Sequence, residues 1–136
     1  MAVLRVPAEM EQYDNVEEFV LEKLPHGMAT SDEALALRLA VEEVFMNIVS
    51  YAYEGAGGEM EVCCDLDEAD HSIDVVISDR GIPFNPLEAG DPDLTLDVME
   101  RGIGGLGIYL TKQYMDEVAY RRENGRNILT MKKKLG

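Results

Sequence analysis

The sequence is short of basic residues, and this shortage limits the partners that the protein can have. Twelve Lys and Arg stand against twenty-seven Asp and Glu, for a formal net charge of -15 over 136 residues. Phosphate backbones and anionic lipid surfaces are held by Lys and Arg. The charge therefore argues against nucleic acid and against a membrane as partners. The basic cluster at Lys132, Lys133 and Lys134 is expected to be a solvated tail.

Cysteine and long apolar runs are also scarce. Cys63 and Cys64 are adjacent, a spacing that suits neither an ordinary disulfide nor a metal site. Packing in a strand is the expected role, with a reactive thiol as the alternative.

No apolar run approaches the roughly 18 residues that span a bilayer, and the N-terminus lacks the pattern of a signal peptide. We expect a soluble, cytoplasmic protein. Its hydrophobic content of 46% predicts a single domain, residues 1–136, with a real core.

The segment from Asp32 to Tyr53 predicts one long helix, capped by Ser31 or Asp32. An apolar stripe recurs at helical spacing, and further apolar residues cover much of the remaining circumference, so we expect the helix to be largely buried. The stripe consists of Leu37, Val41, Val44 and Ile48, and the further residues are Leu35, Leu39 and Met46.

Two polar residues interrupt this apolar helix. Glu43 and Asn47 lie four positions apart and share a face with Ala36 and Ala40. A buried carboxylate and amide need partners. They could pair with each other or cap a neighbouring loop. Alternatively, the alanines leave room for a ligand that Glu43 and Asn47 reach.

The rest of the chain predicts an α+β domain. We expect an edge strand near residues 4–7, a helix from Asp14 or Asn15 to about Leu24, and a hairpin of strands 60–65 and 71–78. A long loop over about 86–102 leads into another helix. A final hairpin, 118–122 with 127–133, surrounds Asn124-Gly125. Helices would cover one face of a mostly antiparallel sheet.

Two motifs besides the long helix suggest chemistry. Gly102, Gly104, Gly105 and Gly107 precede a helix, where backbone amides can approach an anion, although the run could also be a hinge. Neither a Gly-Lys-Ser/Thr sequence nor a feeding strand marks it as a known nucleotide loop. Asp79 and Gly81 end a strand, where a carboxylate could accept a hydrogen bond from an exocyclic amine. The alternative is a simple turn.

Together these segments resemble a known superfamily. The segments are EEVFMN (42–47), DRGIPFNP (79–86), and GIGGLGIYL (102–110) followed by MDEVAYRRENGRNILTMKK. In order and spacing they resemble the nucleotide-binding boxes of the ATPase superfamily to which gyrase, MutL proteins, heat-shock chaperones and histidine kinases belong. Within it, the sequence is most similar to bacterial anti-sigma-factor serine kinases. The resemblance implies a two-layer α/β sandwich of the Bergerat type, with a mixed, mostly antiparallel sheet.

The resemblance also implies roles for individual residues. Asn47 would hold Mg²⁺ against the ATP phosphates, and Glu43 would be the general base. Asp79 would bind the adenine amino group, and Gly81 would pass under the ring. The remaining expected contacts are Thr130 through water, Arg101 at the phosphates, and Gly102, Gly104, Gly105 and Gly107 along them, with the loop from about 86 to 101 as a lid.

The implied function is an ATP-dependent anti-sigma factor that binds a sigma factor and phosphorylates a serine on an anti-anti-sigma (STAS-type) protein. Relatives also commonly form homodimers. A departure from the pattern follows Asn47, where IVSYAYEG replaces the histidine and glycine of many relatives. The alternative function is a nucleotide-gated binding module with little or no kinase activity.

Overall fold

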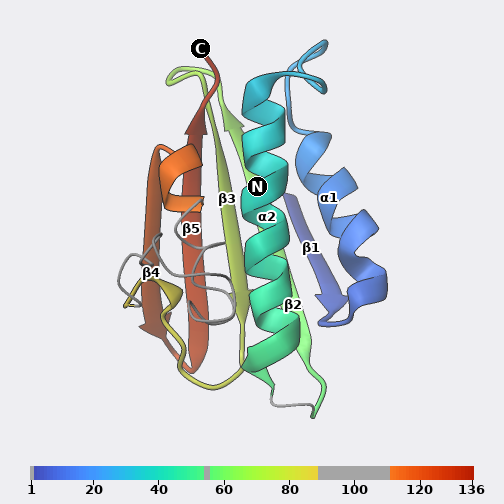
Figure 1. Cartoon of the computed structure of the whole chain (residues 1–136), viewed down its shortest axis with the longest axis vertical. Helices are drawn as coiled ribbons and strands as arrows, with labels where there is room; N and C mark the ends of the chain where they lie inside the picture. The colour runs from blue at the N-terminus through green and yellow to red at the C-terminus, as the bar shows by residue number, and fades with distance from the viewer. Residues whose placement is uncertain (1, 54–55, 89–110) are drawn as a thin grey trace, which may run out of the picture.

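The computed structural model describes residues 2–53, 56–88 and 111–136, in which a five-stranded sheet carries helices on one face (Figure 1). The strand order is β1-β2-β3-β5-β4, and the four described pairings are all antiparallel. The strands are β1 (Ala2–Pro7), β2 (Glu59–Asp67), β3 (Ser72–Asp79), β4 (Glu117–Glu123) and β5 (Arg126–Lys134). The α+β class is confirmed, and no parallel pair occurs among the described strands.

The long helix is present, with a change of geometry after Asn47. Helix α2 (Asp32–Asn47) begins at the N-cap Ser31, whose Oγ accepts a hydrogen bond from Ala34 N at 3.1 Å. It continues as a single π-helical segment, η2 (Ile48–Ala52). Such wider turns are frequent at functional sites. The predicted helix therefore runs nearly to its expected end, but its last turn is wound differently.

The first helix begins earlier than predicted. A 3₁₀ turn, η1 (Met10–Gln12), leads directly into α1 (Tyr13–Leu21). Asp14 thus lies inside the first helical turn and is not the cap. A carboxylate there is favourable because the helix N-terminus carries partial positive charge.

The core lies between the sheet and the two helices. Alternate residues of the central strands are fully buried against α2, as the two-residue period of a strand requires. They are Met60, Val62 and Cys64 on β2 and Ile73, Val75 and Ile77 on β3, and they share one cluster with Leu37, Val41, Val44 and Phe45 of α2. The intervening residues face the opposite side of the sheet, which no described helix covers (Figure 1).

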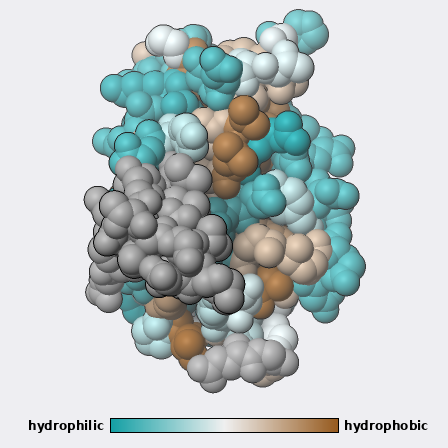
Figure 2. Space-filling view, in the orientation of Figure 1, coloured by the Kyte–Doolittle hydropathy of each residue, from teal (hydrophilic) through white to brown (hydrophobic). Residues whose placement is uncertain are grey.

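The expectation that α2 is largely buried was wrong for one of its sides. Leu35, Leu39 and Met46 are 52%, 45% and 37% exposed. The reason is geometric, because α2 packs on the sheet with one face and against α1 with another. Figure 2 shows hydrophobic surface over the middle of the molecule, where α2 lies. None of the described helices is long and apolar enough to cross a membrane.

The last hairpin confirms its turn signal. Asn124 and Gly125 have φ of 53° and 77°, the left-handed values that a two-residue hairpin turn of this kind needs. On its other side β5 pairs with β3, and this separate pairing places Asn127 opposite Asp79. This pairing determines which residues can share a site.

Candidate functional site

Glu43 and Asn47 lie one turn apart on the same face of α2, near its C-terminal end. Glu43 is half-buried. Burial raises the pKa of its carboxyl above 4.5; the hydrogen bond from Asn47 works against this shift, and the negative charge of Glu42 adds to it. A carboxylate with raised proton affinity is better suited than an exposed one to accept a proton.

Asp79 ends β3 and is 7% exposed. Its Oδ1 accepts hydrogen bonds from Gly81 N at 2.8 Å and from Asn127 Nδ2 at 3.0 Å. Because a carboxylate oxygen has no proton to donate, Asp79 can only accept hydrogen bonds while it is ionised. The two described donors hold the carboxylate in place at the edge of a cavity under α2.

Asn127 is the residue that the sequence interpretation missed. Besides its bond to Asp79, its Nδ2 donates to Ile82 O at 2.8 Å. Its Oδ1 accepts from Tyr120 Oη at 2.6 Å and from Phe84 N at 3.2 Å. Asn127 therefore ties the end of β3, the following loop and β4 together around the Asp79 carboxylate.

A signal for Asn127 was available in the alternation of β5. Met131 and Leu129 are buried on the helix-covered face, and counting back by two reaches Asn127. The same count places Thr130 on the opposite face. There it lies with Asp74 and Lys132 around a different, open cavity. Thr130 thus does not join Asp79 in this structure, and the expected contact does not fit its position, since adjacent strand residues point to opposite faces.

Gly81 is needed for close packing of the backbone. A Cβ at this position would lie 2.1 Å from Ala52 O, and Ile82 N donates to the same oxygen at 2.8 Å. The chain after β3 therefore passes directly against the end of the π-helical segment. This contact places Asp79 beside the end of the long helix.

A cavity joins the residues that the helix and the strand contribute. Its walls are mostly apolar, and its polar groups come from four elements, α2, β3, β4 and β5. It is lined by Val44, Asn47, Ile48, Ala52, Ile77, Asp79, Phe84, Pro86, Tyr120, Asn127 and Leu129. Its volume is about 30 Å³, close to the share of about one water molecule in the liquid. A purine is larger than this.

The mouth of the cavity is formed by side chains that can move more easily than its walls. Phe84 is 40% exposed and its ring lies 5.9 Å from that of Tyr51, centroid to centroid. Pro86 begins the 3₁₀ turn η3 (Pro86–Glu88). The walls, by contrast, are buried residues of α2, β3 and β5. A flat ring could enter where Phe84 now lies.

Part of the predicted site lies outside the described residues. Arg101, Gly102, Gly104, Gly105 and Gly107 belong to this part, as does most of the loop from about 86 to 101. Their expected phosphate contacts stay predictions. Within the described residues, the structure brings together Asn47, Asp79 and Gly81, with Glu43 one turn away on α2.

The chemistry of the described groups fits a nucleotide with Mg²⁺. A buried carboxylate on an apolar cavity suits an amine-bearing ring, because the ring buries its faces while its amine donates. No cluster of three or more metal-binding side chains occurs among the residues described. Mg²⁺ does not need one, since it commonly takes one or two protein oxygens and completes its shell with phosphates and water. The amide of Asn47 can supply such an oxygen.

The fold and this site define a class of protein. The family model of the histidine kinase-like ATPase domain matches residues 6–133, so the chain belongs to that family. A solved histidine kinase domain from the blue-light activated histidine kinase of Erythrobacter litoralis EL346 superposes with a TM-score of 0.52 at 21% identity. The match covers 76% of this chain and 45% of that one, and it supports the fold.

Curated relatives are more similar in sequence. Serine-protein kinase RsbW of Bacillus mycoides (strain KBAB4) is 25% identical over 134 residues, covering 95% of this chain and 82% of the relative. Serine-protein kinase RsbW of Staphylococcus aureus (strain MRSA252) is 28% identical over 128 residues, covering 90% and 79%. The predicted resemblance to serine kinases of this superfamily is therefore confirmed.

Proposed function

We propose that the protein is an ATP-dependent protein-serine kinase that acts as an anti-sigma factor, within one domain of residues 1–136. The observation that supports it most directly is the pairing of Glu43 with Asn47 on α2, beside a cavity that contains the buried Asp79 carboxylate. The similarity to serine-protein kinases over 90% or more of the chain points the same way.

Each residue of the candidate site that the structure describes has a role in the proposed reaction. Asp79 accepts a hydrogen bond from the adenine amino group, and Asn127 keeps the Asp79 carboxylate oriented. Asn47 holds Mg²⁺, which when bound neutralises charge on the phosphates. Glu43 takes the proton from the serine hydroxyl that attacks, since its raised pKa favours proton acceptance. Phosphoryl transfer otherwise asks mainly for positioning.

The remaining roles rest on the sequence. Gly102, Gly104, Gly105 and Gly107 would line the phosphates with free backbone amides, and Arg101 would add a positive charge. In a protein of net charge -15, such groups and Mg²⁺ are needed to make a polyphosphate site favourable.

Nucleotide binding in this proposal moves the mouth of the cavity. A volume of about 30 Å³ cannot hold adenine, so in this proposal the lining side chains, the exposed Phe84 among them, move apart as the ring enters. The backbone of Phe84 donates to Asn127, which in turn contacts Asp79. Ring binding at Asp79 and movement of the loop after β3 are therefore linked through one asparagine.

The partners that follow are a sigma factor and an anti-anti-sigma protein of the STAS type. Binding of one or the other would depend on nucleotide and on phosphorylation of the second partner, which is a population shift between complexes. A homodimer through β1 and α1 is part of the proposal. β1 is the first strand of the sheet order and pairs only with β2 among the described strands, so its outer edge is open to a second strand.

A nucleotide-gated binding module without kinase activity is the second candidate. The buried carboxylate of Asp79 and the amide of Asn47 are enough for nucleotide binding by such a module. The two candidates differ at Glu43, which a pure binding module does not need. Transfer of labelled phosphate to a partner from the same host decides between them.

Calorimetric titration with ATP and ADP, each with and without Mg²⁺, tests the site. We expect ATP to bind more tightly with Mg²⁺ and Asn47→Ala to abolish that difference. Asp79→Asn should weaken both nucleotides, because an amide replaces the acceptor oxygens with a mixed donor and acceptor. Thr130→Ala, on the opposite face of the sheet, is the control. Unchanged affinities in both Asn47→Ala and Asp79→Asn would refute the site.

A further inference from the structure

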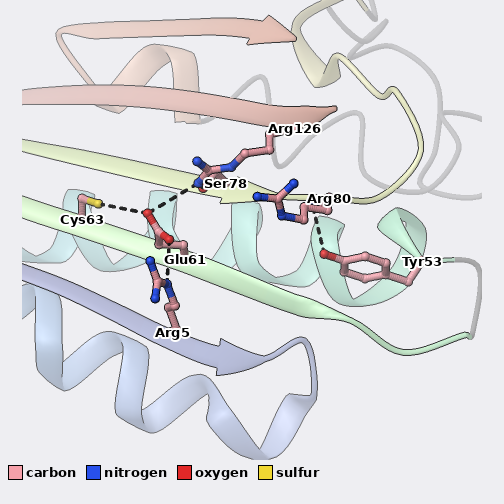
Figure 3. Close-up of polar contacts among 7 residues, drawn as sticks. All are labelled: Arg5, Tyr53, Glu61, Cys63, Ser78, Arg80 and Arg126. Atoms are coloured by element: carbon pink, nitrogen blue, oxygen red, sulfur yellow. Dashed lines mark hydrogen bonds and ion pairs between the residues drawn. The ribbon is translucent and has the colours of Figure 1, made fainter. Parts of the chain in front are cut away.

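A second cavity, on the face of the sheet away from the helices, is larger and more polar than the first. Its volume is about 460 Å³, and its lining includes three arginines: Arg5 of β1, Arg80 after β3 and Arg126 of β5. These residues come from segments far apart in the sequence, yet all three contribute to one hollow (Figure 3). Such a grouping is unexpected on a chain that carries a net charge of -15.

One carboxylate lies between two of the arginines. Arg5 Nε contacts Glu61 Oε2 at 2.9 Å, and Arg126 Nη2 lies 3.4 Å from Glu61 Oε1. Each oxygen of the carboxylate therefore has a guanidinium of its own. The hydrogen bond from Arg5, with the charge of Arg126, lowers the pKa of the Glu61 carboxyl. The protein's own side chain demonstrates that an oxyanion fits between these cations.

The cavity keeps donor groups that Glu61 does not use. Arg80 is exposed, and no described ion pair or side-chain hydrogen bond engages its guanidinium, whereas its backbone N donates to Tyr53 Oη at 2.9 Å. Arg126 also donates to Ser78 Oγ. A guanidinium carries five N–H donors, so Arg126 has further donors available after these contacts.

The charges around the cavity favour a dianion. Arg5 and Arg126 both contact Glu61, and two other carboxyl groups, Glu59 and Asp79, also line the cavity. Glu59 is exposed, and Asp79 holds its carboxylate on the opposite side of β3, against Gly81 and Asn127. A ligand that displaces Glu61 from Arg126 would meet the positive charges of Arg80 and Arg126, and these two charges match those of a phosphate dianion. Arginine is also suited to phosphate because its planar fork can donate two parallel hydrogen bonds.

We propose that this cavity on the open face of the sheet is a binding site for a phosphate group, either free or carried by a small molecule, and that Arg80 and Arg126 are its main contacts. Glu61 then competes with the ligand, because its carboxylate pairs with Arg126 while the site is empty. This phosphate site is separate from the cavity under α2, and the proposal does not depend on whether the protein is a kinase.

Titration of the full chain with inorganic phosphate, followed by amide and arginine Nε NMR signals, tests the proposal. We expect saturable shifts at Ser78, Arg80 and Arg126. Arg126→Gln should weaken phosphate binding about tenfold, because it removes a charged donor that can hold the phosphate through parallel hydrogen bonds. Arg80→Gln should weaken it as well, and it is exposed enough to leave the fold intact.

The distinctive expectation concerns Glu61. Glu61→Gln should tighten phosphate binding several-fold, because it removes the competing negative charge; a purely structural ion pair would predict no gain. Arg121→Gln, an exposed arginine of β4 that pairs with Glu123, is the matched control and should change nothing. Circular dichroism checks that each variant is folded.

Three outcomes would overturn the proposal. One is a non-saturating response that chloride reproduces at equal ionic strength, which would indicate screening only. Another is a response confined to signals around Asn47, which would place phosphate in the nucleotide site alone. The third is equal affinity for phosphate in the wild type, Arg126→Gln and Glu61→Gln. Asn47→Ala separates the two sites, since Asn47 lines only the cavity under α2 and its loss should weaken Mg²⁺-dependent ATP binding and spare phosphate. A parallel titration with AMP distinguishes free phosphate from a phosphate carried on a small molecule.

Discussion

The two faces of the sheet carry two different cavities, and they meet at the end of one strand. On the helix-covered face, a cavity of about 30 Å³ has mostly apolar walls and a buried carboxylate, Asp79. On the open face, a cavity of about 460 Å³ has arginine side chains. Asp79 and Arg80 are neighbours in sequence but serve opposite sides. Because successive side chains of a strand point to opposite faces of the sheet, the end of one strand contributes to two cavities of opposite charge.

The difference in burial has a chemical consequence. Asp79 is buried and held by two described hydrogen bonds, so binding of an amine partner there, as proposed, would be selective. The arginines of the open face lie in contact with solvent, where ion pairs contribute little to stability. The first cavity is therefore suited to discrimination between ligands, and the second to reversible capture of an anion.

The largest expected effect is the loss of phosphate transfer on the helix-covered face. Glu43→Ala should lower the rate of phosphate transfer by roughly 10²- to 10⁴-fold, as expected for a missing general base, while ATP affinity stays close to that of the wild type. Labelled ATP with the phosphoacceptor protein measures the transfer, and calorimetry measures the affinity. Glu42→Ala, an exposed neighbour on α2, is the control. Full activity in Glu43→Ala would refute the assignment of the base.

A smaller effect is expected from substitutions in β5, and it should differ between the two faces of that strand. Asn127→Ala removes four hydrogen bonds and leaves a buried carboxylate with fewer donors, at a cost of about 1–3 kcal/mol in the free energy of unfolding. It should also weaken nucleotide binding. Thr130→Ala, three residues along on the opposite face, should change neither quantity appreciably. Urea unfolding and ATP titration measure both. If Thr130→Ala proved the more damaging for ATP, the placement of Asn127 in the site would be wrong.

The smallest expected effect concerns pH. The pKa of Glu43 is raised in the folded state, mainly by burial, so folding favours its protonated form. The corresponding stability is present below the unfolded pKa near 4.5 and is lost as pH rises through the folded pKa. Glu43→Gln should therefore melt at a higher temperature than the wild type at pH 7, and the difference should shrink as pH falls toward 4.

Thermal melts of Glu43→Gln between pH 4 and 7 provide this measurement. Glu68→Gln, at an exposed turn away from Glu43, accounts for the general loss of one negative charge from an acidic protein. An equal gain in both variants at pH 7 would mean that net charge, and not burial of Glu43, determines the effect. The predicted gain in stability would accompany a loss of transfer activity, because functional sites often hold groups at some cost to the fold.

Most of the architecture could be predicted from local patterns. The helical period of the segment beginning at Asp32, the alternation of Met60, Val62 and Cys64, and the Asn124-Gly125 turn each depend on a few neighbouring residues. The predicted elements match the described ones closely for this reason. The start of α1 was misjudged, because Asp14 is as favourable in a first helical turn as at a cap.

The site was predictable only in part. Glu43, Asn47 and Asp79 belong to motifs that can be read along the chain, and their roles in the site stay predictions. Thr130 was taken from the same motifs, but the structure places it with Asp74 and Lys132 on the far face. The exposure of Leu35 and Leu39 was missed for a related reason, since no pattern within a helix says how many of its sides will be covered.

The amino-acid sequence alone thus determined the secondary structure, the family motifs and the acidic character of the protein, because these depend on local spacing and composition. Only the tertiary structure decided that Asn127 supports Asp79, that Gly81 is needed against Ala52, and that three arginines share one cavity. Strand register and chain packing join residues that are far apart in sequence, and a shift of one residue would exchange the two faces of a strand. Local sequence patterns carry no direct measure of that register.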